Sequence, residues 1–140
     1  MKKLGLLVMC LLPLPAYSEV MTEVYCFSSA DKAPKNLEFR FHYDTSAKWT
    51  VGYLKYADAP RQITLAARDA QWDESDSQRP DDVANSWLEV TTGKVTGEYE
   101  MVTEAGAINA MVYTRYADKK KTTFNRSKTV EGSLEDGCQW

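Results

Sequence analysis

The sequence predicts an all-β protein, a small antiparallel β-barrel of about eight strands closed by one disulfide between its two ends. A β-sandwich is the alternative architecture. Three observations lead to this expectation. Short runs of alternating apolar and polar residues are separated by turn-forming residues, and no stretch keeps a helical period. The first residues have the pattern of an export signal. Beyond that signal only two cysteines remain, near opposite ends of the chain.

Residues 1–18 have the three parts of a secretory signal peptide. Two lysines precede an apolar run at residues 4–14, and a small-x-small cleavage pattern follows at residues 16–18. The apolar run is shorter than the roughly 20 residues that cross a bilayer, so we expect no membrane insertion. The mature protein is then expected to be one domain, residues 19–140.

The clearest strand is LEFRFHY, residues 37–43, in which apolar and polar side chains alternate strictly. Further runs with strand character lie at residues 20–27, 48–56, 62–67, 86–102, 108–116 and 121–126, and in the closing segment. We expect bulky residues to fill the inward faces of these strands: Phe39, Phe41, Tyr43, Trp49 and Tyr53. In the first run, every second residue is one of Val20, Thr22, Val24 and Cys26, and these four are expected to share one face of the strand.

Cys26 and Cys138 are expected to form a disulfide, because two cysteines in an exported chain are paired as a rule. Such a bond closes a loop of nearly the whole domain, which chain-entropy arguments value at about 4–5 kcal/mol. We expect it to join the first strand to the last and so protect both ends of the sheet. Metal binding is disfavoured, since these cysteines and the lone His42 leave a site short of ligands.

The formal charge is −3, and removal of the two signal lysines makes it −5. This balance argues against a nucleic-acid partner and suits a basic protein partner. Residues 73–86 form an acidic loop that follows Trp72, the tryptophan most expected to be exposed. A solvated linker, a docking element for a basic partner and a calcium site are the three interpretations, although the spacing does not match a calcium loop. Its acidic residues are Asp73, Glu74, Asp76, Asp81 and Asp82.

The sequence does not predict an enzyme. His42 is the only histidine, both mature cysteines are assigned to the disulfide, and no nucleophile elbow or phosphate-binding glycine loop occurs. Glu98 and Glu100 share one face of a strand and are the one carboxylate pair to consider for acid–base chemistry. Exposed glutamates are ordinary on a solvated sheet face, so we expect no catalytic residue, metal or cofactor.

Several features resemble the periplasmic inhibitors of C-type lysozyme. Tyr25 directly precedes the first mature cysteine, a Gly-x-Tyr strand (residues 97–99) leads into EAGAINAMVYTR, and a cysteine lies just before the C-terminus. That family has an eight-stranded barrel and a Ser-Gly-x-x-Tyr loop that enters the lysozyme cleft. The nearest stretch here is TTGKVTGEY, residues 91–99. The resemblance implies the barrel, the cysteine pairing and a periplasmic location. This stretch departs from the family loop in its spacing, and its Lys94, Thr96 and Tyr99 are candidate partner-binding residues.

The leading functional hypothesis is therefore a periplasmic inhibitor that binds a cell-wall-degrading enzyme. An immunity protein that neutralises a secreted antibacterial effector has the same gross features and stays open. A barrel that carries a small ligand or glycan is the third hypothesis, and bulky inward residues weigh against it. The candidate partner-binding residues are Trp72, Asp73, Glu74, Asp76, Asp81, Asp82, Lys94, Thr96 and Tyr99.

Overall fold

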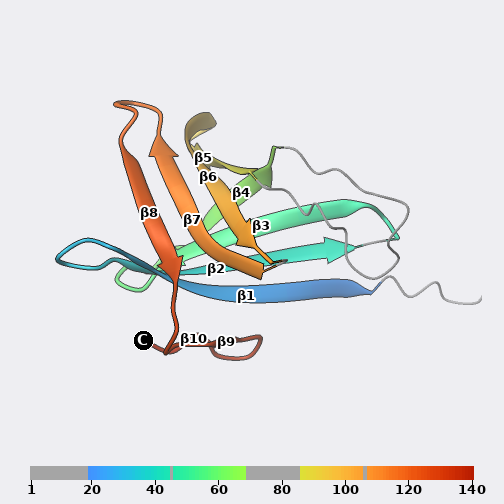
Figure 1. Cartoon of the computed structure of the whole chain (residues 1–140). Coiled ribbons are helices and arrows are strands. Elements are labelled where there is room, and N and C mark those ends of the chain that lie inside the picture. The colour runs from blue at the N-terminus through green and yellow to red at the C-terminus, as the bar shows by residue number, and fades with distance from the viewer. Residues whose placement is uncertain (1–18, 45, 69–85, 106) are drawn as a thin grey trace, which may run out of the picture.

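The structure is a computed structural model that describes residues 19–44, 46–68, 86–105 and 107–140 (Figure 1). The strands of the described residues are β1 (Val20–Ser29), β2 (Asn36–Asp44), β3 (Trp49–Tyr56), β4 (Ile63–Ala67), β5 (Ser86–Thr91), β6 (Lys94–Glu104), β7 (Ala107–Arg115), β8 (Lys121–Arg126), β9 (Gly132–Ser133) and β10 (Gly137–Cys138). The described residues contain no helix. The predicted all-β class is therefore confirmed.

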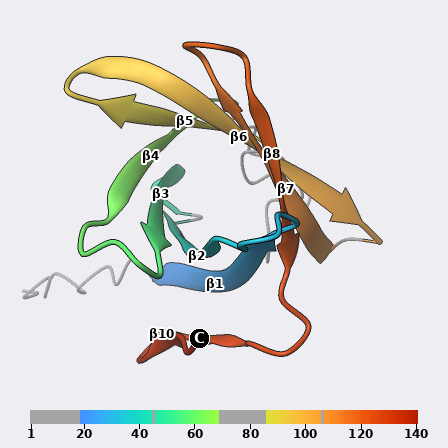
Figure 2. The same cartoon turned by 90° about the vertical axis from the view of Figure 1, so that its left-hand side faces the viewer.

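Strands β1 to β8 form a closed antiparallel barrel in simple sequence order. Each strand pairs with the next, and β8 returns to β1 through the pairs Phe27–Arg126, Ser28–Asn125 and Ser29–Phe124. Figure 2 looks along the barrel and shows these eight strands as a ring. The barrel, rather than the sandwich, is the observed architecture. Closure satisfies the backbone groups that an open sheet leaves exposed along its two edge strands.

Large aromatic side chains fill the interior. The Trp87 ring contacts Phe39 edge-on, with ring centroids 5.4 Å apart, and lies over Gly52. A Cβ atom at Gly52 would lie 2.7 Å from the Trp87 ring, so this position in β3 has room only for glycine. The buried cluster is Tyr25, Phe27, Leu37, Phe39, Phe41, Tyr43, Leu54, Leu65, Trp87, Tyr99, Met101, Ile108, Met111 and Phe124. Burial of this apolar surface is the main driving force for folding.

Two of the predicted inward residues face outward. Phe39, Phe41 and Tyr43 are buried as expected, whereas Trp49 is 40% exposed and Tyr53 packs its ring against His42 on the outer face. In β3 the alternate residues point inward, because Gly52 must lie beneath the Trp87 ring. The expectation for Trp49 and Tyr53 was therefore wrong, because the inward and outward faces of β3 are the reverse of those predicted.

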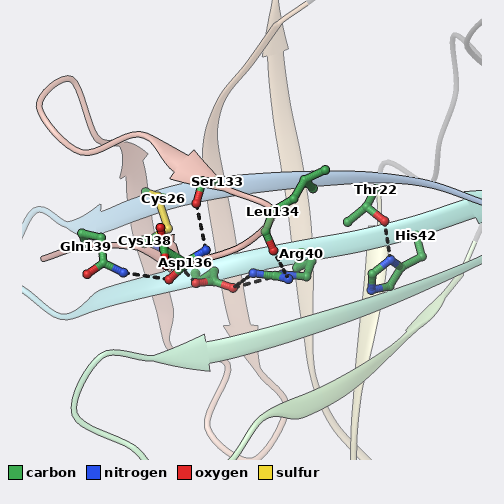
Figure 3. Close-up of polar contacts among 10 residues, drawn as sticks. Thr22, Cys26, Arg40, His42, Ser133, Leu134, Asp136, Cys138 and Gln139 are labelled. Atoms are coloured by element: carbon green, nitrogen blue, oxygen red, sulfur yellow. Dashed lines mark hydrogen bonds and ion pairs between the residues drawn. A yellow bond between two sulfur atoms is a disulfide. The ribbon is translucent and has the colours of Figure 1, made fainter.

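The disulfide between Cys26 and Cys138 is present, with the two Cα atoms 5.8 Å apart. It joins β1 to β10, the last strand of the chain, as expected, although β10 is not one of the barrel strands. Cys138 lies in the β9–β10 hairpin, which packs outside the barrel against the outer face of β1 and β2 (Figures 2 and 3). The backbone N–H of Cys138 donates to the Glu38 carboxylate at 2.9 Å, and Arg40 donates to the Leu134 carbonyl oxygen at 3.2 Å. The bond therefore holds the C-terminal hairpin in place, and β8 closes the barrel without it.

Replacing both Cys26 and Cys138 with alanine is expected to lower the free energy of unfolding by about 4–5 kcal/mol, because the unfolded chain regains the entropy of a 112-residue loop. The barrel should nonetheless remain closed, since the β1–β8 pairing does not involve either cysteine. Urea denaturation measures the first effect. Nuclear Overhauser contacts between β1 and β8 test the second, and their loss would show that the disulfide is needed for closure.

Candidate functional site

One end of the barrel concentrates positive charge. The β1–β2, β3–β4, β5–β6 and β7–β8 connections all lie there, because each joins antiparallel neighbours in sequence order. We call this the basic end and define it as residues 30–35, 57–62, 91–94 and 115–121. It carries eight of the 17 lysines and arginines but three of the 20 aspartates and glutamates, a formal charge of +5 in a chain whose total is −3. The β1–β2 loop projects from this end at the left of Figure 1, and Figure 2 looks onto it.

The β5–β6 hairpin has a strained two-residue turn. Thr91 pairs with Lys94, so Thr92 and Gly93 form the loop, with φ angles of 50° and 75°. Two positive φ values are the signature of a type I′ turn, which favours Asn-Gly. Thr92 is β-branched and therefore poorly suited to this region. Strain of this kind costs about 1–3 kcal/mol and is concentrated at functional sites.

The sides of this hairpin are apolar. Val90 and Val95 face each other across the two strands, and each is more than two-fifths exposed. Lys94 is exposed at the turn between them. The hairpin thus presents one ammonium group flanked by two unburied valines on a short, rigid turn.

A half-buried carboxylate anchors the hairpin to the barrel interior. Glu89, at the foot of the hairpin, accepts hydrogen bonds from Tyr99 at 3.0 Å, Tyr113 at 3.1 Å and Thr96 at 2.7 Å. The Tyr99 and Tyr113 rings stack with centroids 4.5 Å apart, and Tyr56 joins through its hydroxyl, 3.3 Å from that of Tyr99. Both carboxylate oxygens therefore have partners, which offsets the cost of partly burying this carboxylate.

Burial raises the pKa of all three tyrosines above the ordinary value, and the Glu89 carboxylate adds to the shift. A phenolate near a carboxylate in a desolvated site is disfavoured by both causes. The hydroxyls of Tyr56, Tyr99 and Tyr113 thus stay protonated, and those of Tyr99 and Tyr113 stay available as donors to Glu89. The network is a structural support for the hairpin and offers no proton at neutral pH.

A second carboxylate, that of Glu98 in β6, lies on the outer face of the barrel. Glu98 accepts hydrogen bonds from the Ser86 hydroxyl, from Arg68 at 2.7 Å and from Tyr116 at 2.9 Å. The Ser86 bond, followed by those from Arg68 and Tyr116, lowers the pKa of Glu98, while partial desolvation opposes the shift. Glu98 therefore stays ionised and joins β6 to the residues where β4 ends and β5 begins, which does not suit a general acid.

The structure places the predicted site residues in different parts of the protein, and some of them lie outside the described residues. Lys94 is exposed at the hairpin turn, as a partner-binding residue requires, and Thr96 is half-buried against Glu89. Tyr99 is fully buried in the barrel core, so it cannot touch a partner and supports the hairpin from within. Six further predicted residues lie outside the described residues: Trp72, Asp73, Glu74, Asp76, Asp81 and Asp82.

Sequence reasoning missed Glu89, and a usable signal existed. Glu89 lies two residues after Trp87 in one strand, and residues two apart point to the same face. Once Trp87 is assigned to the core, the carboxylate must also point inward and needs buried donors.

The described residues contain no group of three or more histidine, cysteine, aspartate or glutamate side chains that could hold a metal ion. No helix long and apolar enough to cross a membrane occurs in that part of the chain. A scan against protein-family models and searches of curated proteins and of solved structures found no match. The residues themselves are thus the basis for a functional proposal.

Thr92→Asn is expected to raise the free energy of unfolding by about 1 kcal/mol, because asparagine tolerates a positive φ far better than threonine. Urea denaturation measures the change. Thr91→Asn, on the neighbouring strand residue, is the matched control and should stabilise nothing. A Thr92→Asn protein of unchanged or lower stability would show that the turn is not strained.

Glu98 is expected to contribute stability that depends on pH. Its folded pKa lies below the ordinary value of 4.5, so its contribution is complete above about pH 4.5 and is lost as the pH falls through the folded value. The Glu98→Gln protein should therefore be less stable at pH 7 and lose less stability on acidification. Parallel slopes for the two proteins between pH 5 and 2.5 would contradict the assignment, and Glu100→Gln is the control.

Proposed function

We propose that this protein is an exported inhibitor that binds a cell-wall-degrading enzyme and inserts the β5–β6 hairpin into its active-site cleft. The strained turn at Thr92 and Gly93 is the observation that carries the proposal. A threonine at φ 50° reduces stability, and a backbone outlier of this kind points to a function for the turn. The export signal and the disulfide agree with a periplasmic protein.

The hairpin matches the cleft of a glycoside hydrolase in charge and in shape. Such enzymes cleave the glycosidic bond with two carboxyl groups that flank it. Lys94 is exposed at the turn, and the basic end around it has a formal charge of +5. An ammonium group entering between two carboxylates gains a strong electrostatic attraction, while Val90 and Val95 bury apolar surface against the cleft walls.

A ligand-carrying barrel is less well supported. The interior is occupied by Phe39, Phe41, Trp87 and the rest of the aromatic cluster, and an eight-stranded barrel has room for little more. A binding partner of this protein would therefore contact its outer surface rather than its interior.

An immunity protein against a secreted effector is the second candidate, and one surface favours it. A groove on the barrel wall is lined by Trp49, Val51, Ala66 and Val90, and Trp49 is 40% exposed. Val90 also belongs to the hairpin, so the groove and the hairpin form one apolar surface. Exposed tryptophan in such a surface is typical of protein interfaces. A partner without a deep cleft would use this wall more than the turn.

The direct test is the residual activity of chicken-type, goose-type and invertebrate-type lysozymes titrated with the oxidised mature protein. We expect stoichiometric inhibition of at least one class. Lys94→Glu should weaken that inhibition by at least about 30-fold, because it places a negative charge against the catalytic carboxylates.

Lys128→Glu is the matched control, since it makes the same charge change at an exposed residue after β8, away from the basic end. Equal losses for both variants would mean that net charge, rather than the hairpin, governs binding. Full activity of all three lysozymes at excess protein would reject the lysozyme version. Affinity capture with the Trp49→Ala protein as the comparison would then test the immunity version.

A further inference from the structure

We infer that a cavity at the basic end binds a small organic anion, a ring of monosaccharide size that carries a carboxylate or a phosphate. The inference goes beyond the proposed inhibitor function, since it concerns a second site and does not depend on the hairpin entering an enzyme.

The cavity lies between the β1–β2 loop, the end of β3 and the β7–β8 turn. Its volume is about 260 Å³. An engineered cavity of about 150 Å³ holds benzene, and sites for drug-sized ligands begin near 300 Å³. The space therefore fits one substituted ring. It is lined by Asp31, Lys35, Tyr56, Tyr113, Arg115, Lys120, Thr122 and Phe124.

Three cationic side chains converge on this small space from two different connections. Lys35 comes from the β1–β2 loop, whereas Arg115 and Lys120 flank the β7–β8 turn. Asp31 is the one acidic residue in the lining, and Asp118 pairs with Arg115 from outside it, so the wall together with Asp118 has a formal charge of +1. Most surfaces intersperse charges of both signs, and a concave wall with this excess attracts anions.

The β7–β8 turn is built to hold its cations in place. Asp118 accepts hydrogen bonds from Arg115 at 2.9 and 2.5 Å, in a bidentate arrangement. It also accepts the backbone N–H of Lys120 at 3.2 Å, and the backbone N–H of Arg115 donates to the Lys120 carbonyl at 2.9 Å. These bonds fix the Arg115 guanidinium and the backbone at Lys120, and ordered groups lose less conformational entropy when an anion binds.

Aromatic rings supply the rest of the site. Tyr56 and Phe124 meet edge-to-face with centroids 6.3 Å apart, and Tyr113 lies over Gly97, where a Cβ atom would be 2.4 Å from its ring. Because the Tyr113 hydroxyl is bound to Glu89, its ring is fixed in position. Fixed aromatic rings provide apolar surface against which a sugar or aromatic ring packs.

Glu89 does not reverse this preference for anions. Glu89 is not part of the lining, and both its oxygens accept hydrogen bonds, one of them from the Tyr113 hydroxyl of the cavity wall. A ligand in the cavity meets Lys35, Arg115 and Lys120 in the wall, whereas Glu89 is reached only through the Tyr113 hydroxyl. The cavity lining therefore favours an anionic ligand over a cationic one.

The test uses three probes of one size, D-glucuronate, D-glucose 6-phosphate and neutral D-glucose. Each is titrated into the oxidised mature protein at low ionic strength, while amide chemical shifts are followed. At least one of the two anions should produce saturable shifts confined to residues 31–36 and 113–122, and glucose should produce none. The stronger of the two anions identifies the headgroup as carboxylate or phosphate.

The Lys35→Gln/Lys120→Gln protein should bind the better anion at least about tenfold more weakly. Lys119→Gln is the matched control, because Lys119 is in the same turn but lies over the Tyr116 ring instead of lining the cavity; it should change affinity less than threefold. Overlaid spectra of the free proteins establish that both variants are folded. Non-saturating shifts at every lysine, equal binding of glucose, or equal losses for both variants would overturn the inference.

Discussion

The structure depends on one constraint, which is that β1 is buried on both of its faces at Tyr25, Cys26 and Phe27. Tyr25 and Phe27 point into the aromatic core, while Cys26 points outward and is covered by the C-terminal hairpin that it binds covalently. The same strand pairs with β2 along nine residues and receives β8 to close the ring. The core, the closure of the barrel and the attachment of the C-terminal hairpin therefore all depend on the ten residues of β1. A change in the register of β1 would expose Phe27 and misplace Cys26 at once, so this pairing is strongly specified.

Glu89 links the core to the candidate site. Its hydrogen bonds to Tyr99, Tyr113 and Thr96 hold the foot of the β5–β6 hairpin, and Glu89 lies beside a register shift between β5 and β6. A strained turn persists only where the surrounding structure fixes it, and these bonds, with the strand pairing on either side, provide that fixation. In the proposed inhibitor, Tyr99 would therefore support the hairpin from the core without touching a partner. This explains why Tyr99, proposed as a contact residue from the sequence, lies in the core and yet belongs to the site.

The sequence predicted the barrel and the disulfide because both leave local signals: strict alternation in residues 37–43 and two surviving cysteines. It failed in β3, where Trp49 and Tyr53 were expected to face inward. The fit of Gly52 beneath Trp87 determines which face of β3 points inward, and Trp87 belongs to a strand distant in sequence. The basic end escaped notice for a related reason. Its lysines and arginines come from four separate connections, and only the barrel topology brings them together.

The uneven distribution of charge has a physical consequence for how partners approach. The basic end has a formal charge of +5, and the chain as a whole −3, so the remaining residues carry −8. β4 ends and β5 begins at the opposite end of the barrel, and the acidic segment joins them in sequence. A molecule charged in this way orients in the field of a charged partner before contact, which raises the rate of productive encounters at low ionic strength. Overall charge alone suggested a basic partner, whereas the distribution favours an acidic surface opposite the hairpin. A basic enzyme with an acidic cleft satisfies both, since its cleft would face the basic end while its outer surface attracts the rest of the barrel.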